Sequence, residues 1–381
     1  MKASNKVLAS TTAFVTAELG ALPSVKVISN CSEAQLIGLI DELNQVNQPL
    51  LLKGFANLWP LVNASKAGLG SLQSYLEDNQ LSTENDFMVG TGKIPSEHGG
   101  RLFYNQDFTG FNFTRQGQAF SEFLKELFDN SSNVEPDVQQ YLGSTKVDML
   151  FPKLRDDGND ISALTDYSPL INMWMSNQTQ VAAHQDLPHN LAVCVAGKRR
   201  FTLFPPEQID NLYIGPLDLT PAGQAISLVN HQAPDFDEHP KYREALAHAQ
   251  VAELDTGDAL LLPSLWWHSV ESLDALNILI NYWWQPTTHT SQQTERQKRQ
   301  RPNQASGAPM DALLHAFMNI RHLPVNQKDA IKALFDYYVF NEQSPNEQFE
   351  HIPEHARGLL NSQDEIAIRK LRAMLLNKLN Q

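Results

Sequence analysis

The sequence predicts a mainly β fold with additional α-helices, in which a barrel or sandwich in the middle of the chain has helices on either side. The central region contains short apolar or alternating runs separated by Gly, Pro and Asn, a spacing typical of all-β domains. The segments before and after it show helical periodicity instead. The predicted central strands are residues 171–175, 191–195, 201–204, 259–262 and 277–284.

The part of the chain before this region combines helices with one buried strand. Apolar residues recur at helical spacing after Ser32, a good N-cap, so residues 32–44 are predicted to be helical. The apolar run at 49–54 ends in Gly54 and predicts a buried strand. Helices are predicted again at 72–76 and 119–128, and the Gly-rich polar stretch between them is expected to form surface loops.

The end of the chain is expected to be a helical appendage behind a linker. The segment 287–308 is polar and rich in Gln, and its basic cluster at 296–301 is interpreted as a solvated loop. Helical periodicity follows at 310–320, 327–340 and 363–379. We therefore expect a barrel domain over residues 1–290, a linker over 291–307 and a helical region over 308–381.

Composition limits the class of protein. A chain of 381 residues with 42% hydrophobic side chains can bury a large core, and it contains no apolar run of the roughly 18 residues that cross a membrane. The formal net charge of −14 does not favour a nucleic-acid partner. Only Cys31 and Cys194 occur, and the start is interpreted as a mature N-terminus, so we expect a cytoplasmic protein.

Two histidines and an aspartate form a candidate metal site. His184 and Asp186 lie at positions i and i+2, so on a strand both side chains would project from the same face. His268 follows a strand-like run and offers a third ligand. Two histidines and one carboxylate on one face of an octahedron leave positions open for a bidentate co-substrate and dioxygen, as non-haem Fe(II) enzymes require. His189 is assigned a surface role, because its parity differs from that of the ligands.

Several motifs in the same order along the chain resemble one family of enzymes. They resemble the JmjC, or cupin-8, family of Fe(II)- and 2-oxoglutarate-dependent oxygenases, over roughly residues 49–286. The likeness is greatest to the small hydroxylase branch, which includes the asparaginyl hydroxylase of hypoxia-inducible factor and the tRNA wybutosine hydroxylase. It implies a double-stranded β-helix, the jelly-roll or cupin-like barrel. The motifs are Pro49 to Gly54 with Leu58-Trp59-Pro60, His184-Gln185-Asp186, Asn190, Gly197 to Pro206, Gly257 to Pro263, Trp266-Trp267-His268 and Asn281-Tyr282-Trp283.

The resemblance implies roles for individual residues. His184, Asp186 and His268 would hold Fe(II), with 2-oxoglutarate as co-substrate and O2 as oxidant. Asn190 and Asn281 match positions near the metal-chelating end of 2-oxoglutarate, where an amide can hydrogen-bond a carboxylate. An equally weighted alternative makes these two asparagines strand caps or core amides.

The sequence departs from the family where the distal carboxylate of 2-oxoglutarate is bound. Arg199 stands where the family usually has Lys, and Lys198 precedes it; only one of these neighbours can point into the barrel. Arg199 is favoured, because it shares strand parity with the apolar Phe201 and Leu203. An arginine can also clamp a carboxylate bidentately, so the change conserves the chemistry. Val181 replaces a Thr that also contacts this carboxylate. Tyr141 is a further candidate contact, with a core tyrosine as the stronger alternative.

The predicted activity is hydroxylation of a protein side chain, with RNA or a small molecule as the alternative substrate. Two further alternatives are a cupin metalloenzyme that does not use 2-oxoglutarate and a metal-free binding module. The related hydroxylases dimerise through a helical extension, so the resemblance also implies a homodimer. The candidate residues for the dimer surface, which otherwise pack back on the barrel, are Leu313, Phe317, Ile331, Leu334 and Phe335.

Overall fold

The computed structural model describes residues 22–80, 86–133, 136–285, 308–341 and 345–353, together with a few positions between 355 and 376. The chain divides into two compact units, Met1–Ser306 and Gly307–Gln381, which are described separately. Within the described part of the chain, no helix has the length and apolar content needed to cross a membrane.

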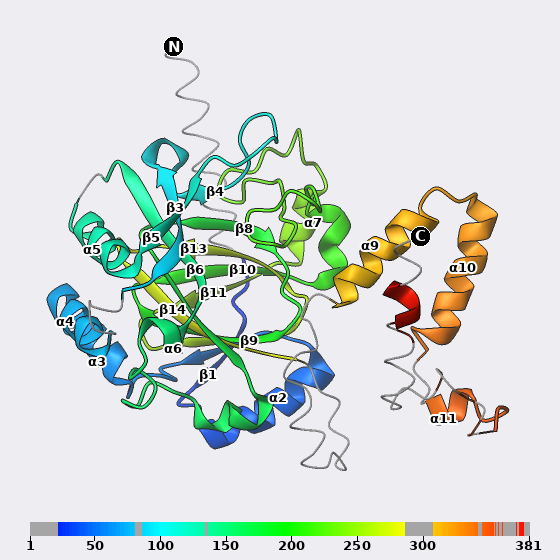
Figure 1. Cartoon of the computed structure of the whole chain (residues 1–381), viewed down its shortest axis with the longest axis horizontal. Helices are drawn as coiled ribbons and strands as arrows, with labels where there is room; N and C mark the ends of the chain where they lie inside the picture. The colour runs from blue at the N-terminus through cyan, green and yellow to red at the C-terminus, as the bar shows by residue number, and fades with distance from the viewer. Residues whose placement is uncertain are drawn as a thin grey trace. The chain divides into compact units, whose positions relative to one another are not determined.

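The first unit is built on two β-sheets (Figure 1). Its strands are β1 (Lys26–Ser29), β2 (Leu50–Lys53), β3 (Met88–Pro95), β4 (Arg101–Leu102), β5 (Thr114–Ala119), β6 (Val138–Lys146), β7 (Leu170–Ser176), β8 (Gln180–His184), β9 (His189–Ala196), β10 (Arg199–Phe204), β11 (Gln250–Leu254), β12 (Ala259–Leu262), β13 (Trp267–Ser272) and β14 (Asn277–Trp284). The larger sheet has the order β1-β2-β12-β9-β14-β7-β6-β3-β5, and the smaller sheet has the order β11-β10-β13-β8-β4. Paired strands are antiparallel except in the pairs β1–β2 and β4–β8.

Helices pack against the outer face of the larger sheet. The helix α2 starts after Ser32, as predicted, with a capping box: the Ser32 hydroxyl accepts from the Gln35 N–H, and the Gln35 side chain accepts from the Ser32 N–H. Leu36, Ile40 and Leu43 on one face of α2 join the main apolar core together with strand residues of this sheet. The helices of this layer are α2 (Glu33–Val46), α3 (Pro60–Lys66), α4 (Leu69–Asn79), α5 (Phe120–Ser131) and α6 (Val147–Leu150), with short 3-10 turns at η2 (Ser96–His98) and η3 (Ser162–Tyr167) elsewhere.

A second core fills the space between the two sheets. On β9, Leu191 packs in the outer core, whereas its neighbour Ala192 and then Cys194 pack inward, as the alternation of side chains along a strand requires. Phe201 and Leu203 of β10 in the smaller sheet meet them there. The two sheets therefore enclose a barrel, and the double-stranded β-helix implied by the resemblance is confirmed.

The outer face of the smaller sheet has its own cover. The turn η4 (Pro206–Asn211) and the helix α7 (Tyr242–Ala247) follow β10 and lead to β11. Tyr242 and Ala245 of α7 pack with Phe204 and Trp267, which project outward from β10 and β13. The long connection between β10 and β11 thus covers the outer face of the smaller sheet.

The region between α4 and α5 differs from the sequence expectation. It was expected to form surface loops, but it contains β3, β4 and β5, and β3 pairs with both β5 and β6 at the end of the larger sheet. These strands carry glycine and many polar residues, because strands near the edge of a sheet that have one solvated face do not need a continuous apolar pattern. The helices predicted on either side, α4 and α5, are both present.

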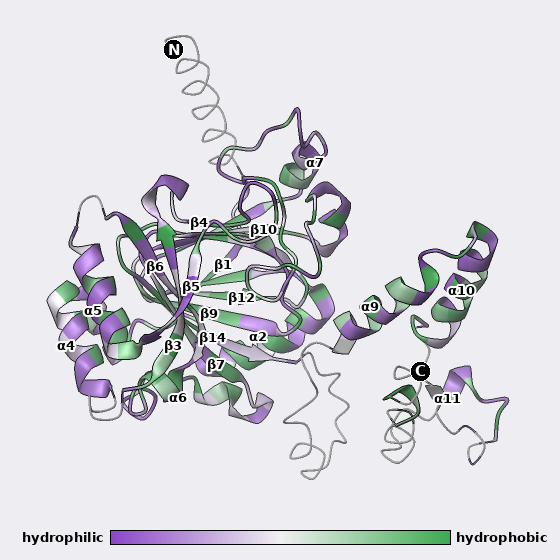
Figure 2. Cartoon of the chain, turned by 45° about the horizontal axis from the view of Figure 1, so that its top comes forward, coloured by the Kyte–Doolittle hydropathy of each residue, from purple (hydrophilic) through white to green (hydrophobic). Residues whose placement is uncertain are grey.

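The second unit contains the helices α9 (Ala308–Ile320), α10 (Val325–Tyr338) and α11 (Pro345–Gln348). Figure 2 shows hydrophobic residues along α9 and α10, and large apolar side chains such as Leu313, Phe317 and Leu334 are exposed there. The predicted linker over 291–307 lies outside the described residues, as does most of the helix predicted at 363–379.

Candidate metal centre

A β-bulge in β8 brings the two predicted histidine ligands together. His184 of β8 is the direct cross-strand partner of His268 of β13, and Val181 is the partner of Val270. Three steps along β8 therefore oppose two steps along β13. Val181 packs against the inner cluster, and the extra residue turns His184 to the same side, where regular alternation would have turned it outward.

Asp186 lies just beyond the end of β8, so the two ligands share one side without sharing a continuous strand. The loop that carries it is fixed by hydrogen bonds to the turn before β13. The Leu265 N–H donates to the Asp186 carbonyl at 2.8 Å, and the Gln185 side chain donates to the Leu265 carbonyl at 2.6 Å. Asp186 is thereby held against the strand that carries His268.

The three side chains meet at one point. One ligand atom from each of His184, Asp186 and His268 lies within 4.8 Å of the others. The imidazole centroids are 4.3 Å apart, and the His268 Nε2 lies 3.5 Å from an Asp186 carboxylate oxygen. Asp186 and His268 are buried, and His184 keeps partial exposure. The three residues singled out by sequence are therefore brought together in space.

The backbone orients both imidazoles for coordination. The His184 Nδ1 lies 3.0 Å from the Ala182 carbonyl, and the His268 Nδ1 lies 3.0 Å from the Trp266 carbonyl. A carbonyl only accepts hydrogen bonds, so these contacts place the proton on Nδ1 and leave the Nε2 lone pair for a metal.

The charges of the centre favour a cation. Burial and the nearby His268 lower the pKa of His184 to about 4, so this imidazole is neutral at physiological pH. Burial raises the pKa of Asp186, but the close side-chain contact with His268 and the electrostatic interactions with both histidines outweigh it and hold this pKa below its ordinary value. A neutral imidazole and a buried carboxylate in one cluster match the donor set of a divalent transition metal.

The structure separates the two basic residues considered for the distal carboxylate. Arg199 is buried at 5% exposure and points into the barrel. The Lys198 side chain is 58% exposed and pairs with Asp255 at 3.0 Å on the outside. Arg199 stands opposite Ser272 on β13, four residues along the strand from the position opposite His268. It therefore lies in the same barrel as the triad, about 13 Å along the sheet.

The Arg199 guanidinium has no counter-charge among the described residues. Its Nε and one Nη atom are buried without a hydrogen-bond partner. The groups that interact with its charge are the Cys194 thiol and the Tyr141 hydroxyl, and burial raises the pKa of each to about 12, so both are neutral. A buried, unpaired cation is costly, and an anionic ligand would compensate it.

Tyr141, on β6, is close enough to both Arg199 and the triad residue Asp186 to interact with each. The charges of both Arg199 and Asp186 act on its hydroxyl. Its ring centroid lies 6.4 Å from that of Trp174, and a Cβ added at Gly143 would come within 3.1 Å of the Tyr141 ring and 3.3 Å of the Trp174 ring. A glycine and two aromatic rings thus pack closely at this part of β6 and β7.

The two predicted asparagines are adjacent to each other. Asn281 of β14 accepts a hydrogen bond from the Trp174 indole at 2.9 Å and donates a long one, 3.5 Å, to Asn190 of β9. Both amides are buried. In this arrangement they satisfy each other, as the core-amide alternative expects, and the long contact between them is weak.

Two residues near the site differ from the sequence analysis. His189 is buried, at 4% exposure, so its predicted surface role is wrong; it contacts the Asn44 side chain and accepts from the Ser264 N–H, which ties β9 to α2 and to the turn before β13. Gln224 was missed, although its amide lies 3.4 Å from Asp186. It belongs to a long loop without periodicity, and no sequence signal marks it.

Comparisons with known proteins agree with this geometry. A family model described as a cupin-like domain matches residues 39–290. The lysine-specific demethylase JMJ31 of Arabidopsis thaliana is 27% identical over 69% of this chain and 50% of its own length. The tRNA wybutosine-synthesizing protein 5 of Mus musculus is 25% identical over 54% of this chain and 60% of its own length. The Jumonji C domain-containing protein 5 of Drosophila melanogaster is 24% identical over 69% of this chain and 62% of its own. The chain thus spans between half and just under two thirds of these relatives.

Proposed function

Because the chain belongs to the cupin-like, or JmjC, family, we propose that it is an Fe(II)- and 2-oxoglutarate-dependent oxygenase that hydroxylates a side chain of a protein. The triad would hold Fe(II), and O2 would be the oxidant. One observation carries the proposal: the buried Arg199 guanidinium has no anionic partner among the described residues and lies in the barrel that contains the triad.

The triad supplies three ligands and leaves the rest of a coordination sphere to other molecules. His184, Asp186 and His268 come from one strand pair and the loop beside it, so they approach a shared ion from one side. When bound, Fe(II) with 2-oxoglutarate and O2 supplies the oxidising chemistry that inserts one oxygen atom into a C–H bond, while 2-oxoglutarate becomes succinate and CO2. The surrounding residues position both substrates.

Arg199 would bind the distal carboxylate of 2-oxoglutarate. Arg199 lies about 13 Å along β10 from Leu203, the residue opposite His268. A five-carbon diacid bound at the metal and the long arginine side chain would together bridge this distance. Tyr141, whose hydroxyl keeps its proton because its pKa is raised to about 12, is a second donor to the same carboxylate. The absence of a hydroxyl at Val181 leaves more of this task to Arg199.

Asn190 and Asn281 would assist at the other end of the co-substrate. Their mutual hydrogen bond is long, so exchanging it for a bond to a carboxylate oxygen costs little. The Trp174 indole donates to Asn281 and keeps its amide oriented.

Turnover of 2-oxoglutarate tests the co-substrate assignment. Purified protein with Fe(II), O2 and 2-oxoglutarate is expected to form succinate, slowly without the main substrate. The alternative, a cupin metalloenzyme that does not use 2-oxoglutarate, predicts instead that no succinate forms and that Arg199→Gln leaves metal-dependent activity unchanged.

The substrate class rests on charge. A net charge of −14 opposes an extended contact with a phosphate backbone, which favours a protein over RNA. One relative is named a demethylase of lysine and another a tRNA-modifying protein, so relatives of this chain differ in substrate.

Isotope labelling distinguishes the substrate classes. A cell extract is incubated with the protein, Fe(II), 2-oxoglutarate and ¹⁸O₂, and peptides, nucleosides and small molecules are analysed by mass spectrometry. We expect the label in specific peptides, and not in a parallel reaction with His268→Ala. Label confined to nucleosides or small molecules would contradict a protein substrate.

A further inference from the structure

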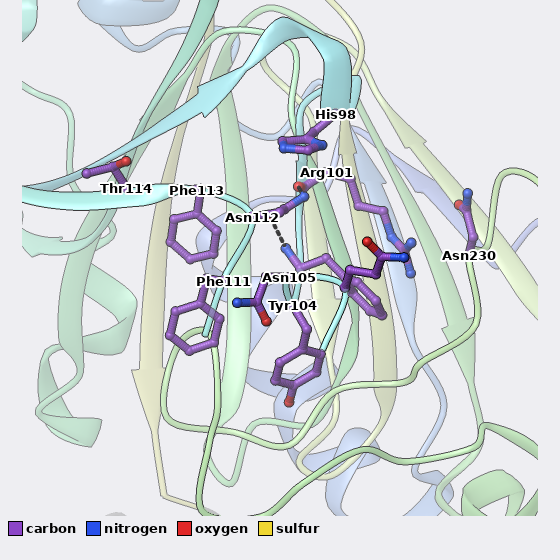
Figure 3. Close-up of a pocket in the computed structure, with 11 residues that line it drawn as sticks. His98, Arg101, Tyr104, Asn105, Phe111, Asn112, Phe113, Thr114 and Asn230 are labelled. Atoms are coloured by element: carbon purple, nitrogen blue, oxygen red, sulfur yellow. Dashed lines mark hydrogen bonds between the residues drawn. The ribbon is translucent and has the colours of Figure 1, made fainter. Parts of the chain in front are cut away.

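A cavity of about 640 Å³ lies beside the smaller sheet, and none of the triad residues lines it. Its walls come mainly from residues 98–114, which run from η2 through β4 to the start of β5. Figure 3 shows Arg101 on one side of the cavity and Phe111 and Phe113 on the other. The proposed chemistry at the triad does not use this cavity.

Aromatic rings form the apolar walls. Phe111 and Phe113 stack with centroids 5.3 Å apart, and Phe103 packs edge-on against Tyr104 at 5.3 Å. The Tyr104 hydroxyl donates to the Leu219 carbonyl at 2.8 Å and fixes the ring. The cavity is therefore bounded by side chains that hold one another in place.

Two arginines stack on these rings without an acidic partner. The Arg101 guanidinium lies 3.5 Å from the Phe103 centroid, and the Arg115 guanidinium lies 4.7 Å from that of Phe111. Each donates a hydrogen bond to a backbone carbonyl, and in the described part of the chain no carboxylate pairs with either. Burial lowers the pKa of Arg101 to about 10, so it stays charged at neutral pH.

The loop that carries these groups is held by its own amides. The Asn112 side chain accepts from the Phe103 N–H and donates to the Arg101 carbonyl, both at 2.9 Å. The Asn105 side chain accepts from the Thr109 N–H at 3.0 Å. The cation and the rings are thus set in position before a ligand arrives, which reduces the entropy cost of binding.

The cavity is coupled by position to the metal centre. Strand β4 pairs with β8, placing Arg101 opposite Gln180, and β8 ends at His184, about 13 Å further along. The connection after β10 also reaches both places: its Leu219 carbonyl accepts from Tyr104, and Gln224 contacts Asp186. Leu102 pairs with the inward-facing Val181, so its neighbour Arg101 lies on the other face of this sheet from His184. A peptide that reaches both places must pass the edge strand β4, which takes at least about four extended residues.

We propose that this cavity binds the carboxylate of an Asp or Glu in the protein substrate, a few residues from the side chain that reacts at the triad. That the bound peptide is a substrate rests on the proposed function. Arg101, with Arg115 at the rim, supplies the charge that an acidic side chain needs, and the rings accept its apolar neighbours. A nucleic acid fits less well, because a single positively charged pocket with apolar walls cannot contact the successive phosphates of its backbone.

Fluorescence anisotropy with two synthetic peptides tests this proposal on the full-length protein. One fluorescein-labelled peptide alternates Glu and Leu, and its partner has Gln in place of every Glu. We expect the Glu peptide to bind at least about tenfold more tightly and to lose affinity as salt is raised. Arg101→Gln should remove this preference, whereas Arg243→Gln, which removes an arginine stacked on Phe236 elsewhere, should retain it.

Three results would overturn the proposal: equal affinity for the two peptides, a Glu preference that survives Arg101→Gln, or binding of labelled oligouridylate in place of the Glu peptide. If circular dichroism shows that Arg101→Gln does not fold, Arg115→Gln at the exposed rim serves instead and should weaken binding of the Glu peptide about threefold. Binding of Fe(II) and 2-oxoglutarate is measured separately on the unaltered protein. Its failure would overturn the proposed function, while a Glu preference dependent on the arginines would still establish the cavity as an acidic-peptide site.

Discussion

His184 and His268 face each other directly across the antiparallel pair β8–β13, and the bulge between Val181 and His184 turns the His184 imidazole to the inner side, where His268 lies. Each ring is fixed by the carbonyl of the residue two positions before it in the chain. The metal centre is therefore a property of one strand pair, completed by the loop that carries Asp186.

Replacing a ligand should abolish metal binding. His268→Ala removes one of three donors from a preformed site, and we expect the affinity for Fe(II) to fall by at least about 100-fold. Isothermal titration under anaerobic conditions measures it. His248→Ala, at an exposed histidine on the protein surface, is the control and should bind Fe(II) normally. Unchanged affinity in His268→Ala would contradict the assigned centre.

Arg199 and Lys198 should differ in their effect on co-substrate binding. Arg199→Gln removes the buried cation, and a lost charge-assisted hydrogen bond of about 1.5–3 kcal/mol corresponds to a 10- to 100-fold rise in the KM for 2-oxoglutarate. Lys198→Gln, which alters an outward-facing residue, should leave KM unchanged. The reverse pattern would show that the parity argument assigned the wrong residue.

The metal-free protein should lose stability in mild acid. Burial lowers the pKa of His189 and of His231 to about 4, from an ordinary value of 6.5. The unfolded chain therefore binds protons first, and the free energy of unfolding should fall as the pH drops from 6.5 towards 4. Urea unfolding across this range measures the slope. His189→Gln should make it shallower; an unchanged slope would mean that His189 is not buried as a neutral group.

Two glycines should respond in opposite directions to alanine. Gly197, in the turn between β9 and β10, has φ +73°, and a Cβ there would clash with the Leu276 carbonyl oxygen. Gly197→Ala should lower the free energy of unfolding by about 2 kcal/mol or more. A Cβ added at Gly38, on the exposed side of α2, would have no atom within 4 Å. Gly38→Ala should therefore raise the free energy of unfolding by about 0.5–1 kcal/mol. Thermal or chemical unfolding of both variants decides whether the turn carries this strain.

The helical unit is expected to mediate a homodimer. Leu313 and Phe317 of α9 are 51% and 44% exposed, and exposed apolar residues of this size on neighbouring helical turns are typical of interaction surfaces. Sedimentation should give a dimer at micromolar concentration, and a monomer after the paired change Leu313→Asp and Phe317→Asp. A monomeric mass for the unaltered protein would remove this proposal.

Much of the fold and the triad could be predicted from the sequence. The capping residue Ser32 marks the start of α2. The strands β2, β9, β12 and β14 are buried on both faces, so each contains an apolar run that can be recognised in the sequence. His184, Asp186 and His268 were recognisable because their neighbours follow a family pattern. The parity of residues 199, 201 and 203 also predicted the inward direction of Arg199.

The features that the sequence did not reveal depend on long-range pairing. Strands β3 and β5 lie at the end of the larger sheet and lack an apolar pattern. The bulge in β8 arises from its register against β13, and no property of residues 181–184 alone predicts it. Strand parity assigned His189 to the surface, yet α2 and the turn before β13 enclose it.

Anaerobic titration of the metal-free protein with Fe(II) and then 2-oxoglutarate tests the metal centre most directly. We expect a weak visible absorption band that appears only after 2-oxoglutarate is added, and that is lost in His268→Ala. No band under these conditions, or an equal band in His268→Ala, would contradict coordination of Fe(II) and the co-substrate by this triad.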